Sequence, residues 1–360
     1  MSNAPLKGNI GEWSELYALG YLLVHGGAFA ADQNQDAIPD VFHKVLQVHL
    51  GGNSNQLDLN YVIRNAEIAI LISGNEVARI DRSLIQVTIE AMLSELEDGK
   101  LRKTFQLMSG GDLLRLLKRD RISAGSGETE NDLELVLEDQ LTQAPTPRVG
   151  FNIKSQLGGR ATLLNASGAT NFIFNIVPNS IHTQNRYPNF VHGKHSRNLH
   201  LLYEAGYHLE FDKISSEKFQ NNLMLLDLKC PEHLAQVLLH SYLTEEKSFE
   251  QVVKKVYPNS DMNSKQAVFK LKEFLGAVAM GLRPSIEWDG DTTKFSGLLV
   301  VKSSGEVVFY YLYNRKNFEE HLFRNVGFER PSTSRHRYGE IYSENGQDKL
   351  KLNLQIRFTT

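Results

Sequence analysis

Apolar residues recur at helical spacing near the start of the chain and again over its third quarter. Trp13, Leu16, Tyr17 and Leu23 fall on one face of a helix. The same spacing returns in several later segments. We therefore predict helices over 12–24, 81–96, 112–119, 222–243, 249–257 and 264–280.

Alternating apolar and polar residues mark the strands. Leu133, Leu135 and Leu137 alternate with polar residues, which predicts a half-buried strand. The chain then turns and returns over 150–157, so we expect a hairpin. Asn345-Gly346 predicts another hairpin near the end of the chain. The predicted strands are 42–50, 66–73, 132–138, 150–157, 172–177, 295–301, 306–313, 339–342 and 349–358.

These elements predict a mixed α/β fold. We expect a core over 1–210, a helical segment over 211–285 and a β-rich part over 286–360. At 360 residues, with 41% hydrophobic and 22% charged content, the chain has the composition of a globular protein with a sizeable core.

Composition also excludes several classes of protein. No run of about 18 apolar residues predicts a membrane span, and no secretory signal is visible, so we expect a cytoplasmic location. Cys230 is the only cysteine, which excludes an internal disulfide and a cysteine-rich zinc site. The net charge of −3 argues against a protein that coats nucleic acid nonspecifically. It is compatible with a nuclease whose carboxylates offset a basic cleft.

The hairpin brings an acid and a lysine together. Pairing about a centre near 141–143 places Asp132 across from Ile153 and Lys154. Asp132 would bind a hard divalent cation, and Lys154 would hold or activate the water that attacks phosphorus. Asp139 is the competing acid, at the turn end of its strand. The alternative interpretation is structural, with Asp132 a solvated strand cap and Lys154 a surface lysine.

A second carboxylate should come from elsewhere, because Asn152 offers only an amide, a weak ligand for Mg²⁺. Glu12 and Glu15 lie three apart on one helical face. Acids also favour a first helical turn through the helix dipole, so both glutamates have a structural explanation too. Glu134, which shares strand parity with Asp132, is a third option.

One similar tract is interpreted differently. Asp227-Leu228-Lys229 also has an acid two residues before a lysine, but it ends one helical run just before Pro231. Proline is common at the first turn of a helix, so we assign Asp227 to capping.

Basic and polar residues gather near the end of the chain. Arg335, His336 and Arg337 lie between predicted elements, where side chains are free to reach a DNA groove. A second set with common parity on the predicted last strand is Lys349, Lys351, Gln355 and Arg357, and a weaker loop cluster is Lys194, His195 and Arg197.

The sequence resembles the HpaII family of type II restriction endonucleases along nearly its whole length. The matching tracts include Gly11-Glu12-Trp13-Ser14-Glu15-Leu16-Tyr17 and Lys351-Leu352-Asn353-Leu354-Gln355-Ile356-Arg357-Phe358. The most specific block is Gly150-Phe151-Asn152-Ile153-Lys154-Ser155-Gln156-Leu157-Gly158 with Thr162-Leu163-Leu164-Asn165-Ala166-Ser167 and Thr170-Asn171-Phe172.

The resemblance implies a PD-(D/E)xK restriction-endonuclease-like core that cleaves double-stranded DNA with Mg²⁺, and for the family's namesake the site CCGG. Asp132 and Lys154 would occupy the acidic and lysine motif positions, with Asp132 and Glu15 (or Glu12) at the metal. Asn152 departs from the motif's acid and favours one metal ion over two.

The same resemblance implies partners and contacts. A homodimer would suit a palindromic site, and a DNA methyltransferase would act on that site without needing to bind this chain. A structure-specific nuclease on the same core and an inactive DNA-binding protein are the alternatives. The candidate DNA-contacting residues are Ser155, Gln156, Asn165, Ser167, Asn171, Arg335, His336, Arg337, Lys351, Gln355 and Arg357.

Overall fold

The computed structural model describes most of the chain and divides it into two compact units. Unit 1 comprises Met1–Ala161 and Thr292–Phe318, and unit 2 comprises Thr162–Asp291 and Glu319–Thr360. These divisions do not coincide with those expected at residues 210 and 285. The described residues are 6–32, 34–50, 58–99, 104–122, 131–158, 160–180, 187–258, 260–290, 295–311 and 315–359.

Unit 1 is built on a mixed sheet. Its order in the described residues is β1-β12-β11-β7-β6-β2-β3-β4-β5, and β1 also pairs with β2. The long strand β2 meets β1 through its first part and β6 and β3 through its second. The strands are β1 (Gly27–Ala31), β2 (Ala37–Leu50), β3 (Leu59–Ile63), β4 (Glu67–Ile72), β5 (Asn75–Asp81), β6 (Leu133–Leu137), β7 (Val149–Ser155), β11 (Phe295–Val301) and β12 (Val307–Tyr311).

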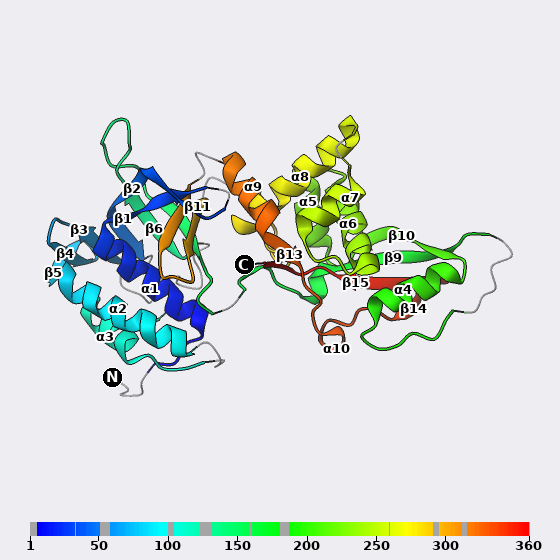
Figure 1. Ribbon diagram of the computed structural model, residues 1–360, viewed down its shortest axis with the longest axis horizontal. Coiled ribbons are helices and arrows are strands. Elements are labelled where there is room, and N and C mark those ends of the chain that lie inside the picture. Colours follow the sequence, from blue (N-terminus) through cyan, green and yellow to red (C-terminus); the bar gives the residue numbers. More distant parts are fainter. Residues whose placement is uncertain are drawn as a thin grey trace. The chain divides into compact units, whose positions relative to one another are not determined.

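Helices α1 (Ile10–His25), α2 (Arg82–Gly99) and α3 (Met108–Leu116) pack together beside this sheet, as Figure 1 shows. The predicted apolar face of the first helix is buried: Trp13 and Leu16 share one core cluster with Leu133 and Phe151 of the sheet. The helix ends at Gly26, which takes the left-handed conformation (φ 69°) that an L side chain adopts at a cost.

In the described residues, unit 2 combines helices with two smaller sheets, ordered β10-β9-β15-β14 and β13-β16-β8. Figure 1 labels β9, β10, β14 and β15 of the first of these sheets. The strands of unit 2 are β8 (Thr162–Leu164), β9 (Asn171–Pro178), β10 (Tyr207–Ile214), β13 (Val326–Phe328), β14 (Ile341–Glu344), β15 (Gln347–Asn353) and β16 (Ile356–Phe358). Its helices are η1 (Gly168–Thr170), α4 (His195–Glu204), α5 (Glu217–Leu226), α6 (Cys230–Thr244), α7 (Phe249–Val256), α8 (Met262–Ala279) and α10 (Thr333–His336), while α9 (Arg315–Asn325) runs across the division between the units.

The mixed α/β prediction is confirmed, with two corrections in unit 2. The predicted helix 222–243 is interrupted at Asp227, which caps α5 and accepts the Lys229 N–H. The predicted strand 349–358 breaks after Asn353, because the Leu354 N–H leaves the ladder and donates to the Thr170 carbonyl. The Asn345-Gly346 hairpin forms as predicted. None of the described helices has both the length and the apolar content needed to cross a bilayer.

Candidate active site

Strands β6 and β7 form the predicted hairpin. Leu133 pairs with Phe151 and Leu135 with Val149 in an antiparallel ladder. That register is centred on residue 142, within the predicted range. Continued by one residue it sets Asp132 opposite Asn152, one position before the predicted Ile153.

Two hydrogen bonds fix Asp132 at the end of this hairpin. Its N–H donates to the Phe151 carbonyl (3.1 Å), and its Oδ2 accepts the Ile153 N–H (2.7 Å). A hydrogen bond from a backbone N–H to a carboxylate is stronger than one between neutral groups. The carboxylate is therefore held beside β7 by backbone atoms.

Asn152 and Lys154 lie on one face of β7. Phe151 and Ile153 point the other way, into the core cluster that α1 covers, and both are buried. Side chains alternate along a strand, so the half-buried Asn152 and Lys154 occupy the face opposite α1. The ladder directs Glu134 of β6 to this same face. The site is thus an acid, an amide and an ammonium at one end of two adjacent strands.

Sequence reasoning missed one residue pair beside the site. A Cβ on Gly150 would stand 2.1 Å from Asn131 Nδ2, so the missing side chain makes room for Asn131 immediately before Asp132. The only signal was a glycine inside a strand, which often marks a close approach of other atoms.

Asp139 stabilises the hairpin turn through hydrogen bonds. Its Oδ1 accepts the N–H groups of Leu141 (3.1 Å) and Thr142 (2.7 Å) and the Thr142 hydroxyl (2.8 Å). The bonds from Thr142 hold the pKa of Asp139 below its usual value. This geometry favours Asp132 over Asp139 as the acid of the site.

The two helix glutamates have different surroundings. Glu12 closes a capping box: its Oε2 accepts the Asn9 N–H (2.7 Å), while its own N–H donates to Asn9 Oδ1 (3.1 Å). Glu15 lies near Arg119, whose pKa is lowered by burial, with Tyr61 and Glu15 acting in the opposite direction. Helix α1 packs on the face of the sheet that bears Phe151 and Ile153. A role for Glu12 or Glu15 at a metal stays a prediction.

The donors suit the Mg²⁺ that the resemblance implies. Asp132 supplies a carboxylate and Asn152 an amide, and Mg²⁺ prefers such hard oxygens while keeping several waters. Within the described part of the chain, no three His, Cys, Asp or Glu side chains form a group able to hold a metal. Asp132 and Asn152 are therefore oxygen donors of the kind that Mg²⁺ accepts.

Two of the residues predicted to contact DNA, Ser155 and Gln156, form hydrogen bonds within the protein at the end of β7. Ser155 Oγ accepts the Leu157 N–H (3.1 Å). Gln156 Nε2 donates to Oε1 of Gln35 (2.7 Å), a buried residue in the left-handed conformation (φ 70°). These bonds stabilise the strand end, and contacts of Ser155 and Gln156 with DNA stay predictions.

The other predicted contacts lie in unit 2. Asn165 is exposed, whereas Ser167 is the N-cap of η1 and its N–H donates to Thr170 Oγ1 (3.0 Å). Asn171 is only 4% exposed, and its Nδ2 donates to the His336 carbonyl (3.0 Å). Burial corrects the expectation of a direct DNA contact by Asn171.

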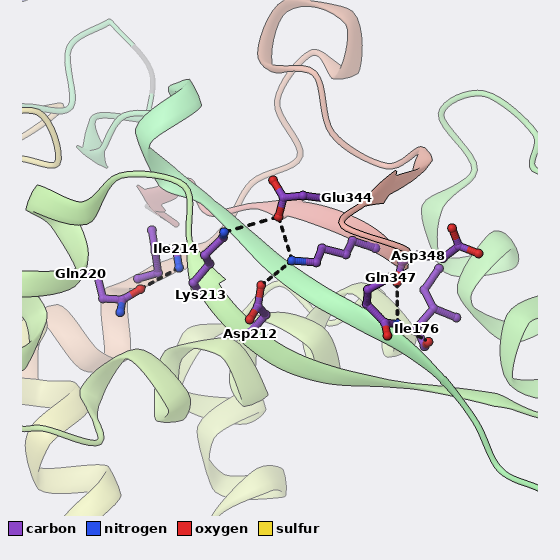
Figure 2. Close-up of polar contacts among 9 residues, drawn as sticks. Ile176, Asp212, Lys213, Ile214, Gln220, Glu344, Gln347 and Asp348 are labelled. Atoms are coloured by element: carbon purple, nitrogen blue, oxygen red, sulfur yellow. Dashed lines mark hydrogen bonds and ion pairs between the residues drawn. The ribbon is translucent and has the colours of Figure 1, made fainter.

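Lys349 of the predicted basic strand is neutralised inside unit 2. Its Nζ lies 2.8 Å from Glu344 Oε2 and 2.9 Å from Asp212 Oδ2. Glu344 also forms an ion pair with Lys213, whose Nζ lies 3.4 Å from Glu344 Oε2 (Figure 2). The hydrogen bonds that Lys349 donates to Glu344 and Asp212 raise its pKa. This lysine has structural partners and is a poor candidate for phosphate.

The remaining members of that strand are separated. Lys351 stays on β15, with its ammonium 4.5 Å from the centre of the Tyr342 ring. Gln355 falls in the break after β15, and Arg357 is on β16 in the other sheet of the unit. Their predicted common face therefore does not exist. Arg335 and Arg337 are exposed at the end of α10, with the half-buried His336 between them.

Comparison with known proteins identifies the family. A model of the HpaII restriction endonuclease family matches residues 9–358. The type II restriction enzyme HpaII of Haemophilus parainfluenzae is 37% identical over 359 residues, covering 98% of both chains. No solved structure matches. This chain belongs to the HpaII restriction endonuclease family.

Proposed function

We propose that this chain is a type II restriction endonuclease that hydrolyses double-stranded DNA at a specific site with Mg²⁺, leaving 5′-phosphate ends. Family membership supports cleavage of DNA. The observation that carries the chemistry is the Asp132 carboxylate, held by the Ile153 N–H at 2.7 Å on the hairpin that bears Lys154. Binding of DNA without cleavage would not need an acid and a lysine in that arrangement.

Each residue of the site has a role in the proposed reaction. Lys154 orients the water that attacks phosphorus and places a positive charge near the developing pentacovalent phosphate. Asp132 and the Asn152 amide bind the cation, and Glu15 or Glu12 is the proposed further acid. Bound Mg²⁺ supplies charge stabilisation for the phosphate and for the leaving 3′-oxygen.

Digestion of a DNA of known sequence tests the function. We expect discrete fragments with Mg²⁺ and none with EDTA, and sequencing of the ends should reveal one recurrent short site. We propose CCGG as that site, by likeness to HpaII. Binding to duplex DNA with no cleavage under any divalent cation would support an inactive binding protein, and preferential cutting of branched DNA would support a structure-specific nuclease.

A palindromic site suggests a symmetric enzyme. We propose that two copies act as a homodimer on CCGG, since twofold symmetry in the DNA is matched by twofold symmetry in the protein. A methyltransferase that modifies the same site would protect the host DNA without contacting this chain.

Asn152→Asp is expected to strengthen metal binding. A carboxylate is a better Mg²⁺ ligand than an amide, so the Mg²⁺ concentration for half-maximal cleavage should fall about tenfold. Titration of Mg²⁺ in a plasmid cleavage assay measures it. Asn75→Asp, which adds the same charge at an exposed position of β5, is the control and should leave the requirement unchanged. Equal Mg²⁺ requirements in Asn152→Asp and wild type would place residue 152 outside the metal site.

A further inference from the structure

The exposed arginines of unit 2 are presented by a short, tightly turned segment. Arg335 lies in α10, and Arg337 follows it in the left-handed conformation (φ 51°). The Arg337 N–H donates to the Thr333 carbonyl (2.8 Å) and the His336 N–H to the Ser332 carbonyl (3.2 Å). A helix of four residues has little stability of its own, so tertiary contacts must hold it.

A buried amide provides one such contact. Asn171 stands at the start of β9, is 4% exposed, and donates from Nδ2 to the His336 carbonyl at 3.0 Å. That carbonyl lies between the two arginines. Asn171 thus fixes the backbone of the turn at its centre, across 165 positions of sequence.

A second buried amide fixes the first. Asn353, which is fully buried, donates from Nδ2 to Asn171 Oδ1 (2.7 Å) and to the Ser167 carbonyl (2.7 Å). With its oxygen occupied by Asn353, the Asn171 amide is oriented with its NH₂ toward His336. Asn353 therefore orients the Asn171 amide, and the Asn171 amide in turn holds the His336 carbonyl.

The two ends of the turn are anchored separately. Tyr338 is buried and its hydroxyl donates to the Pro331 carbonyl (2.7 Å), while its ring stacks on His195 with centroids 5.0 Å apart. His195 Nε2 is 3.3 Å from Thr333 Oγ1. These contacts fix where the turn begins and ends, so Asn171 is left to set its middle.

We propose that Asn171 is a positioning residue for DNA binding: through the His336 carbonyl, and oriented by Asn353, it holds Arg335 and Arg337 in place for phosphates of duplex DNA. The inference rests on the proposed function, since it needs DNA as the ligand. Arg335 and Arg337 touch the DNA, and Asn171 acts through them. A rigid turn binds more tightly than a loose one because less side-chain and backbone freedom is lost on binding.

Hydrogen exchange and salt-dependent binding test the proposal with the full chain. In Asn171→Ala, without DNA or metal, the amides of residues 336 and 337 should exchange faster than in wild type. Affinity for a CCGG duplex, measured in Ca²⁺ to prevent cleavage, should fall about tenfold. The slope of log K against log salt should drop by up to about two, as expected when two phosphate contacts are lost. Cleavage at saturating DNA should keep the wild-type rate.

Two comparisons make the result specific. Asn175→Ala, on the same strand β9 and the same face, is the matched control and should behave as wild type. Arg335→Ala/Arg337→Ala should reproduce the loss of slope, and adding Asn171→Ala to it should cause no further loss. Asn171→Leu, which keeps the branching at Cγ but has no polar atoms, replaces Asn171→Ala if that variant does not fold.

Distinct outcomes overturn the proposal. Unchanged exchange at residues 336 and 337 would show that Asn171 does not hold the turn. Faster exchange with an unchanged salt slope would show that the turn does not serve DNA binding. Failure of the nuclease proposal is recognised separately, as wild-type protein that binds DNA but never cuts it, because neither exchange nor binding requires cleavage.

Discussion

Lys154→Ala should abolish useful cleavage while leaving DNA binding largely intact. Loss of a group that positions or activates the attacking water costs between about a hundredfold and ten-thousandfold in rate. Lys154 is half-buried on the face of β7 opposite the hairpin core, so truncation should not unfold the strand. Single-turnover cleavage and duplex binding, measured on the same preparation, separate the two effects.

The control for this variant is another lysine of the same sheet. Lys44 of β2 forms an ion pair with Glu138 at 2.6 Å on the surface, and such exposed pairs contribute about 1 kcal/mol or less. Lys44→Ala should therefore cut at the wild-type rate. Cleavage by Lys154→Ala at the wild-type rate would remove this lysine from the chemistry.

Asp132→Asn should be the second inactive variant, and an informative one because it preserves the fold. The amide oxygen can still accept the Ile153 N–H, so the hairpin end remains closed. What is lost is the negative charge that binds the cation. Loss of several kcal/mol of charge stabilisation corresponds to a decrease in the cleavage rate of about a thousandfold or more. Thermal unfolding with and without Mg²⁺ measures the stability of the fold and the binding of the cation, and a cleavage assay on the same preparation measures the rate.

Asp139→Asn decides between the two acids of the hairpin. Asp139 caps the turn through Leu141 and Thr142, so its neutralisation should lower stability modestly and leave cleavage near wild type. If instead Asp139→Asn were inactive and Asp132→Asn active, the assignment of the two acids would be reversed.

Local pattern predicted the site hairpin well because every signal in it is short-range. Alternating leucines, a turn and a returning apolar strand determine both the partner strand and a register centred on residue 142. The first helix was predicted from its apolar spacing for the same reason. The position opposite Asp132 came out one residue away, because the observed centre at residue 142 sets Asp132 opposite Asn152, and a centre at 143 would be needed to reach Lys154.

Long-range partners could not be predicted from the sequence. Lys349 appears as a free cation, yet Asp212, from a strand 137 positions earlier, neutralises it. Asn171 carries an amide of the kind that contacts DNA, but strand β15 and the turn at His336 enclose its side chain. Whether a polar side chain contacts solvent or another part of the chain depends on tertiary packing. The periodicity of apolar and polar residues in a short segment carries no information about it.

The neighbours of β7 have a consequence for biosynthesis. On one side β7 pairs with β6, close in sequence, but on the other it pairs in parallel with β11, joining Asn152 to Leu298 and Lys154 to Val300. Until the ribosome has made β11, the strand bearing Lys154 is an unprotected edge. A nascent or prematurely terminated chain thus carries the lysine without its finished surroundings, and a host is exposed to an assembled nuclease only once translation is nearly complete.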